Sequence, residues 1–187
     1  MVNRPRMEPS SRSLEDLVSG IDAAIASEAS PNSSPDLARR TDTSDRYVAF
    51  SVGGILFAAA VPSVQEINRV PPITPVPNVP AWLLGVTNLR GDVVSVVDLR
   101  AFLDLEAVDA RDSRRILVAR SPITTCLVVD QVDGMVRIPR DQLQAPDAAG
   151  RDKASAFIRG FYHGADQLTT VLDIEKLLES PEMRQFD

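Results

Sequence analysis

The sequence is poor in the residues on which most catalytic and metal-binding sites depend. It has one histidine, one cysteine and one tryptophan among 187 residues, and aromatic side chains make up 5% of the chain. A single cysteine excludes an internal disulfide framework and fits a reducing cytosol. No apolar run approaches the roughly 20 residues that a membrane-spanning helix needs, and the N-terminus has no apolar core of the signal-peptide type. We therefore expect a cytoplasmic protein without direct membrane insertion.

The few reactive side chains also stand apart from one another. His163 lies in an expected loop, and Cys126 alternates with apolar neighbours, which is typical of a small core residue. No group of histidine, cysteine and carboxylates has metal-ligand spacing. Gly53-Gly54 is expected to be a hairpin turn, because a phosphate-binding loop would need a helix behind it. The sequence thus predicts no enzyme, no cofactor and no metal site.

The charge pattern argues against a nucleic-acid partner. The formal net charge is −6, and the eighteen arginines and two lysines are scattered along the chain. A nucleic-acid-binding protein usually gathers its basic residues into a stripe or patch. No such stripe is visible, so we expect no nucleic acid among the partners.

Residues 1–44 differ in composition from the rest of the chain and are expected to form an N-terminal extension. Apolar residues recur there at helical spacing, which predicts an amphipathic helix over 13–28: Leu14, Leu17, Val18, Ile21 and Ile25. The Ser/Asn/Pro-rich segment after it predicts a flexible linker. A helix this short is marginal alone. It either packs on its own domain, belongs to a disordered tail or docks on a partner, and the sequence leaves these alternatives open.

From residue 45 onward the chain repeats one pattern. Each copy predicts a hairpin, a crossover, an Arg-Gly turn, a long strand and a carboxylate, with an offset of roughly 68 to 75 residues. The best-defined stretch is Gly85–Arg100, and its weaker copy is Phe157–Gly160 followed by Thr170–Ile174. In this alignment Phe157 stands where the first copy has Asn88. The polar turn of the first copy is therefore the unrepeated part, and we expect function there.

Short strands and frequent turns predict an all-β fold of two small closed barrels that share a core. A parallel α/β sheet would need amphipathic helices between its strands, and these are missing. The proline-rich segment Pro71–Pro80 is expected to cross the surface in an extended conformation. We expect a helical turn at Pro80–Leu84, with Trp82 as a core residue. Asp173 is expected to cap a short C-terminal helix.

Several motifs together resemble the CheW family of chemotaxis coupling proteins, over roughly residues 45–183. The matching stretches are Val64–Ile67, Gly85–Gly91, Val96–Arg100, Val128–Asp130 and Asp173–Leu178. The resemblance implies two intertwined five-stranded SH3-like β-barrels with a short C-terminal helix. It also implies a non-enzymatic adaptor that couples the cytoplasmic tips of methyl-accepting chemotaxis receptors to the regulatory domain of the histidine kinase CheA, at membrane-associated receptor arrays.

The resemblance leaves alternatives open. The protein could instead be a CheW-like scaffold for polar localisation, or part of a pilus or gliding-motility chemosensory system. Other CheW-like domains, arranged in rings, are a further expected partner. A small-ligand-binding double barrel would need a closed apolar cavity with converging polar groups, whereas the polar residues here lie at an outer turn.

Six residues are candidates for partner binding: Val64, Glu66, Ile67, Asn88, Arg90 and Gly91. Val64 and Ile67 are expected to form the apolar floor of a groove that holds a receptor helix. Arg90 is expected at the edge of that groove, on a turn in which Gly91 takes positive φ and Asn88 bonds the local backbone. We hypothesise that Glu66 pairs with Arg90 and orients it. Asp98 and Asp130 end apolar strands and are expected to be structural.

Overall fold

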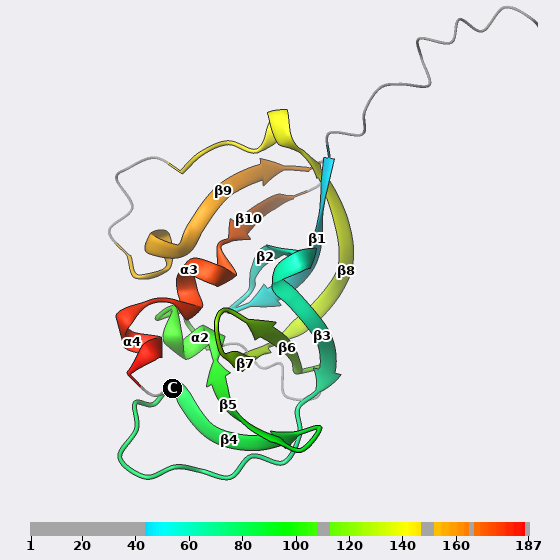
Figure 1. Cartoon of the computed structure of the whole chain (residues 1–187). Coiled ribbons are helices and arrows are strands. Elements are labelled where there is room, and N and C mark those ends of the chain that lie inside the picture. The colour runs from blue at the N-terminus through cyan, green and yellow to red at the C-terminus, as the bar shows by residue number, and fades with distance from the viewer. Residues whose placement is uncertain (1–43, 108–112, 147–151, 165–166, 186–187) are drawn as a thin grey trace, which may run out of the picture. The chain divides into compact units, whose positions relative to one another are not determined.

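The computed structural model describes residues 44–107, 113–146, 152–164 and 167–185. The expected N-terminal helix over 13–28 falls outside these ranges. Within them the chain forms ten strands in two five-stranded sheets, with a few short helices (Figure 1). None of the helices in the described ranges is long and apolar enough to cross a membrane. The predicted all-β architecture is confirmed.

The strands are named in chain order. The first sheet contains β1 (Ser44–Val52), β2 (Ile55–Ala60), β8 (Gln131–Pro139), β9 (Ile158–His163) and β10 (Leu168–Leu172). The second contains β3 (Val64–Arg69), β4 (Leu83–Leu89), β5 (Asp92–Asp98), β6 (Arg115–Arg120) and β7 (Thr124–Val129). The short helices are η1 (Val61–Ser63), α2 (Leu99–Phe102), η2 (Arg140–Gln142), η3 (Ala154–Phe157), α3 (Ile174–Leu178) and α4 (Pro181–Arg184).

The two halves of the described domain exchange hairpins. The strand order is β8-β1-β2-β10-β9 in the first sheet and β3-β6-β7-β5-β4 in the second. The two orders coincide when β1 to β5 are matched in sequence with β6 to β10. Each sheet therefore combines the hairpin of one half with three strands of the other. The hairpin joins those strands on one side through a parallel pair, β2 with β10 and β7 with β5, and on the other side through an antiparallel pair, β1 with β8 and β6 with β3. This exchange confirms that the two five-stranded units are intertwined.

The structural repeat corrects the alignment suggested by the sequence. The backbone N–H of Asp98 donates to the carbonyl of Trp82 at 2.8 Å, and Asp173 donates to Phe157 at the same distance. Phe157 is thus the counterpart of Trp82, and the match of Phe157 with Asn88 is wrong. Arg159 lies inside β9, so the second half has no Arg-Gly turn at that point.

The constraint that the two halves share is a close backbone crossing at Gly85 and Gly160. A Cβ atom on Gly85 would lie 2.2 Å from the carbonyl oxygen of Thr74, and one on Gly160 would lie 2.7 Å from that of Gln144. Thr74 and Gln144 each exchange two backbone hydrogen bonds with the residue that follows the glycine. Only glycine permits this approach. Thr74 belongs to the proline-rich segment, which is mostly exposed, as expected.

Three apolar clusters hold the sheets together. The largest, called the inter-sheet core below, joins Phe50 and Phe57 of the first sheet to Leu117 and Leu127 of the second. Each sheet also encloses a smaller inner cluster of its own. Trp82 is partly buried against the inter-sheet core, as expected. The helical turn expected around it is a simple turn that leads directly into β4.

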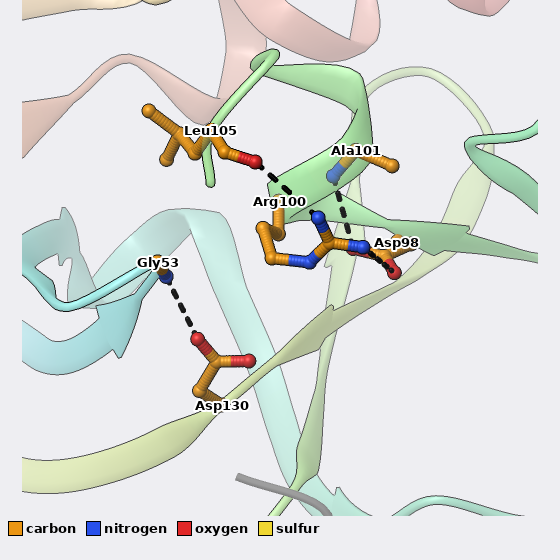
Figure 2. Close-up of polar contacts among 6 residues, drawn as sticks. All are labelled: Gly53, Asp98, Arg100, Ala101, Leu105 and Asp130. Atoms are coloured by element: carbon orange, nitrogen blue, oxygen red, sulfur yellow. Dashed lines mark hydrogen bonds and ion pairs between the residues drawn. The ribbon is translucent and has the colours of Figure 1, made fainter. Parts of the chain in front are cut away.

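Two strand-end carboxylates act as helix caps, which confirms the cap expected at Asp173 and the structural role expected for Asp98. The Asp98 carboxylate accepts a hydrogen bond from the backbone N–H of Ala101 at 3.0 Å, and Arg100 lies 3.4 Å from its other oxygen (Figure 2). Asp173 accepts from the backbone N–H of Lys176 at 3.0 Å. These contacts satisfy amides at the starts of α2 and α3 that have no partner within the helix.

A third carboxylate holds the first hairpin. Asp130 is buried and accepts a hydrogen bond from the backbone N–H of Gly53 at 2.7 Å (Figure 2). Gly53 and Gly54 have φ values of +60° and +76°, as a two-residue primed turn requires. The expected structural role of Asp130 and the predicted hairpin turn are both confirmed.

Candidate partner-binding site

The turn between β4 and β5 consists of Arg90 and Gly91, both with positive φ, at +57° and +99°. The backbone N–H of Gly91 donates to the side-chain oxygen of Asn88 at 3.0 Å, so both conformational predictions for this turn are confirmed. The positive φ of Arg90 was not predicted. Asparagine and glycine are the usual residues of such turns, and a non-glycine residue in this conformation costs of order 1 kcal/mol.

Arg90 forms the predicted ion pair with Glu66. Its Nη2 atom donates to Glu66 Oε2 at 2.6 Å, and the two side chains are 78% and 21% exposed, respectively. Glu66 lies on β3 and Arg90 follows β4, and these two strands form the opposite edges of the second sheet. The pair therefore spans the opening between the two edges of one curled sheet.

A β-bulge in β3 decides which way the candidate side chains face. Val64 lies opposite Ala119 of β6, and Glu66 lies opposite the adjacent residue Val118, so Gln65 has no partner in the ladder. One extra residue in a strand shifts the alternation of side chains by one position. Val64 and Glu66 thus lie on different faces, although they are two residues apart.

The register assigns each face to a different apolar cluster. Ala119 belongs to the inter-sheet core, whereas Val118 belongs to the inner cluster of the second sheet. Directly opposed residues of antiparallel strands share a face. Val64, and Ile67 opposite Leu117, therefore lie on the inter-sheet side, and Glu66 lies on the inner side. The structure divides the six candidates between these two faces.

The inter-sheet side of β3 has an equivalent in β8. Val64 and Val132 both pack, partly buried, against the inter-sheet core. Three residues after each of them an apolar side chain is exposed, Ile67 at 41% and Met135 at 62%. β8 has the corresponding bulge, since Ala49 pairs with Gly134 and Phe50 with Val132. We call Val64, Ile67, Val132 and Met135 the apolar strip. Val132 and Met135 are not among the candidates found from the sequence.

The other face carries the polar candidates. Glu66 and Arg90 line a hollow of about 340 Å³ whose floor includes Val94 and Val118. Two exposed apolar residues border it, Val93 at 73% and Ile123 at 46%. We call Glu66, Arg90, Val93 and Ile123 the mouth of the second sheet. Asn88 and Gly91 belong to this side through the turn that they shape.

The described residues contain no group of three or more histidine, cysteine or carboxylate side chains that could hold a metal ion. Burial, with a smaller effect of the nearby Glu66, raises the pKa of Cys126 to about 11. A thiol with such a pKa is a poor nucleophile at neutral pH. His163 is the exposed last residue of β9, not a loop residue as expected.

Comparison with known proteins identifies the family. Residues 46–182 match the model of the CheW-like domain. The chemotaxis protein CheW of Rhizobium meliloti is 32% identical over 144 residues, which cover 76% of this chain and 92% of that protein. Protein FrzA of Myxococcus xanthus is 30% identical over 79% of this chain and 94% of its own.

Two further matches differ in what they cover. Protein PilI of Pseudomonas aeruginosa is 36% identical over 121 residues, which are 62% of this chain and 66% of that protein. The scaffolding protein TtCheW from Thermoanaerobacter tengcongensis superposes with a TM-score of 0.68 at 23% identity, covering 74% of this chain and 95% of that chain. This structure supports the fold. The family match covers well over half of the chain, and the chain therefore belongs to the CheW-like domain family.

Proposed function

We propose that this protein is a non-enzymatic adaptor that couples the cytoplasmic tips of chemoreceptors to a CheA-type histidine kinase in a chemosensory array. Family membership over residues 46–182 and relatives named as chemotaxis proteins support the proposal. The observation that carries it is the division of β3 into two chemically different faces. An adaptor must hold two partners at once, and one rigid strand with a partner surface on each side meets that need.

The apolar strip is the proposed receptor surface. A receptor tip is a helical hairpin, and an amphipathic helix binds by laying its apolar stripe into an apolar groove. Val64 and Val132 would form the floor of that groove because they pack against the inter-sheet core. Ile67 and Met135 would contact the helix directly because they are exposed. This arrangement keeps Val64 and Ile67 in the expected groove and adds the β8 side to it. Arg90, which the sequence placed at the edge of that groove, belongs with Glu66 to the other face.

The mouth of the second sheet is the proposed surface for the regulatory domain of the kinase. The guanidinium of Arg90 is largely exposed and already held by one carboxylate. Its remaining donors can bind a carboxylate or the carbonyl oxygens at the end of a partner helix. Val93 and Ile123 would supply the apolar contact area beside it. The same face could also contact another CheW-like domain in a ring.

Co-purification of tagged protein with a receptor-tip fragment and with the kinase regulatory domain tests this function. We expect the wild type to retain both, Arg90→Glu to lose the kinase domain but keep the receptor, and Ile67→Glu to do the reverse. Circular dichroism checks that each variant is folded. A folded wild type that binds neither partner contradicts the adaptor function, and variants that each lose both partners contradict the two-surface assignment.

A second candidate is a CheW-like scaffold for polar localisation or for a pilus or gliding-motility chemosensory system. Two relatives of this chain, PilI and FrzA, do not carry the name CheW, and this observation supports the second candidate. A deletion strain distinguishes the candidates. Loss of directed swimming supports the first, and loss of surface movement with intact swimming supports the second.

A further inference from the structure

Two adjoining hollows lie at one end of the first sheet, where β1 begins and β2 and β10 end. The first has a volume of about 370 Å³ and is lined by residues 44–47, 60–62 and 159. The second has a volume of about 230 Å³ and is lined by residues 47, 60, 62, 63, 159 and 171–175. Tyr47, Ala60, Pro62 and Arg159 line both, so the two hollows meet along these residues.

The first hollow carries an excess of positive charge. Arg46 and Arg159 line it, and both side chains are exposed. Asp45 is the one carboxylate among the described residues that line it. Both of its oxygens accept hydrogen bonds from Arg140, at 2.8 and 3.0 Å, so its charge is already balanced. We call the first hollow, with Arg46 and Arg159, the basic hollow.

The second hollow carries an excess of negative charge. Asp173 and Glu175 line it, whereas Arg159 is the one cation among its described lining residues. No ion pair between described residues involves Arg46, Arg159 or Glu175. Each of these three charges is therefore available to a partner. We call the second hollow, with Asp173 and Glu175, the acidic hollow.

The equivalent of Glu175 in the other half is engaged within the fold. Asp173 is equivalent to Asp98, because both cap a helix and both donate the same backbone hydrogen bond, so Glu175 is equivalent to Arg100. The Arg100 guanidinium lies 3.4 Å from the Asp98 carboxylate and donates to the carbonyl oxygen of Leu105 at 3.3 Å (Figure 2). Glu175 is exposed, and its carboxylate accepts no hydrogen bond within the described part of the chain.

The equivalent of Arg159 in the other half is apolar. Gly85 and Gly160 are equivalent as the glycines of the two backbone crossings, so Arg159 is equivalent to Leu84. Leu84 packs, partly buried, against the inner cluster of the second sheet. The fold thus accepts an apolar residue at this position and does not require a guanidinium. Arg159 and Glu175 are surface charges that distinguish one half from the other.

Adjoining surfaces of opposite charge match a second copy of themselves. A two-fold axis exchanges the two sides of an interface, so that each contact occurs twice. With the axis near Arg159, where the hollows meet, the basic hollow of one copy faces the acidic hollow of the other. Arg46 of one copy then lies opposite Glu175 of the other. Guanidinium–carboxylate pairs of this kind form strong, charge-assisted hydrogen bonds.

We propose that this protein forms a two-fold symmetric dimer through the basic and acidic hollows, held by reciprocal Arg46–Glu175 ion pairs around the apolar Ala60 and Pro62. The partner in this contact is a second copy of the chain. None of the described residues that line the hollow at the mouth of the second sheet lines either of these hollows. The dimer contact and the proposed kinase surface are therefore built from different residues.

Sedimentation equilibrium of the full chain, at several concentrations and ionic strengths, tests this proposal. The variants are R46E and E175R. The control is R120E, which makes the same change of charge as R46E at the exposed Arg120 beside the mouth of the second sheet. We expect the wild type and the control to dimerise, and their dimers to dissociate as the salt concentration rises. R46E and E175R should each weaken dimerisation at least about tenfold.

An equimolar mixture of R46E and E175R gives the sharpest result. Each variant alone places like charges at both contacts of a dimer, whereas a mixed dimer pairs opposite charges at both. We expect the mixture to dimerise about as well as the wild type. Circular dichroism checks that each variant is folded.

The opposite outcomes overturn the inference. A wild type that stays monomeric at every concentration shows that the two hollows do not associate. Loss of the dimer in R120E, or equal dimerisation of all the proteins, places the contact elsewhere on the molecule. Folded single variants whose mixture stays monomeric contradict the reciprocal Arg46–Glu175 pairs.

Discussion

Glu66 and Arg90 come from the two opposite edges of one sheet and meet through a 2.6 Å hydrogen bond across its opening. The arginine is 78% exposed, so the pair contributes little to the stability of the fold, typically about 0 to 1 kcal/mol. Its more specific effect is to restrict a long cationic side chain to one direction at the mouth of the second sheet. A partner that binds Arg90 there does not need to order it first.

A double-mutant cycle of Glu66→Lys and Arg90→Glu measures this coupling. We expect each reversal alone to weaken binding of the kinase regulatory domain at least tenfold, because each leaves two like charges about one hydrogen-bond length apart. The exchanged pair should recover part of the affinity. Isothermal titration calorimetry of the four proteins gives the coupling energy, which we expect to exceed about 1 kcal/mol. Independent, additive effects of the two changes would falsify the orienting role of Glu66.

Arg90→Asn separates the conformation of the turn from the chemistry of its side chain. Asn-Gly is the dipeptide best suited to a two-residue primed turn, whereas arginine occupies this turn with φ of +57°. We therefore expect urea denaturation to show unchanged or higher stability, by up to about 1 kcal/mol. Binding of the kinase domain should nevertheless fall as far as it does in Arg90→Ala. Retained binding would show that the turn, not the guanidinium, is what the partner recognises.

Three glycine-to-alanine variants separate steric clash from backbone strain. Gly85→Ala would place its Cβ against the Thr74 carbonyl and would also have to keep a φ of +138°. Gly160→Ala would suffer only the steric clash, and Gly134→Ala would suffer only the backbone strain of a φ of +127°. We expect losses in the free energy of unfolding of about 3 kcal/mol or more for Gly85→Ala, about 2 for Gly160→Ala and about 1 for Gly134→Ala. Equal losses at all three positions would contradict the close crossing seen at the first two.

The features that the sequence could predict are those set by local chemistry. The Gly53-Gly54 hairpin follows from two adjacent glycines between β-branched strands, and the cap at Asp98 follows from a carboxylate placed at a strand end. The Glu66–Arg90 pair follows from the hypothesis that two candidate residues of opposite charge meet, and the structure shows their hydrogen bond. Each of these inferences needs only a few neighbouring residues or one complementary pair of charges.

The features that could not be predicted depend on strand register. The bulge at Gln65 has no side-chain signature, because it exists only relative to the partner strand β6. Without it Val64 and Glu66 would share a face, and Ile67 would lie on the opposite face. The match of Phe157 with Asn88 failed for a related reason. The Arg-Gly dipeptide forms a turn in the first half only, whereas the constraint that both halves share is the backbone crossing at Gly85 and Gly160.

The two aspartate caps predict a graded loss of stability. Asp98→Ala and Asp173→Ala should each lower the free energy of unfolding by about 1 kcal/mol, because each removes the acceptor for a backbone N–H at a helix start. Asp98→Ala should lower the free energy of unfolding more than Asp173→Ala does, because Asp98 is buried and its removal also deprives Arg100 of a nearby carboxylate. Asp98→Asn keeps an oxygen that can cap the helix, so urea denaturation should show a smaller loss in the free energy of unfolding than for Asp98→Ala. An Asn variant as unstable as the Ala variant would show that the charge, not the cap, is what matters.

Cys126 should make the stability of the fold fall at high pH. Burial raises its pKa from 9.0 to about 11, so the folded protein retains a proton that the unfolded chain loses. Stability is therefore complete below about pH 9 and declines as pH rises to about 11, by at most about 1.4 kcal/mol per pH unit from this group. Urea denaturation of the wild type and of Cys126→Ala between these pH values isolates the effect, because all other titrating groups are shared. The wild type should lose stability more steeply. Parallel pH profiles, or rapid reaction of the folded protein with a thiol reagent at pH 8, would contradict a buried, protonated thiol.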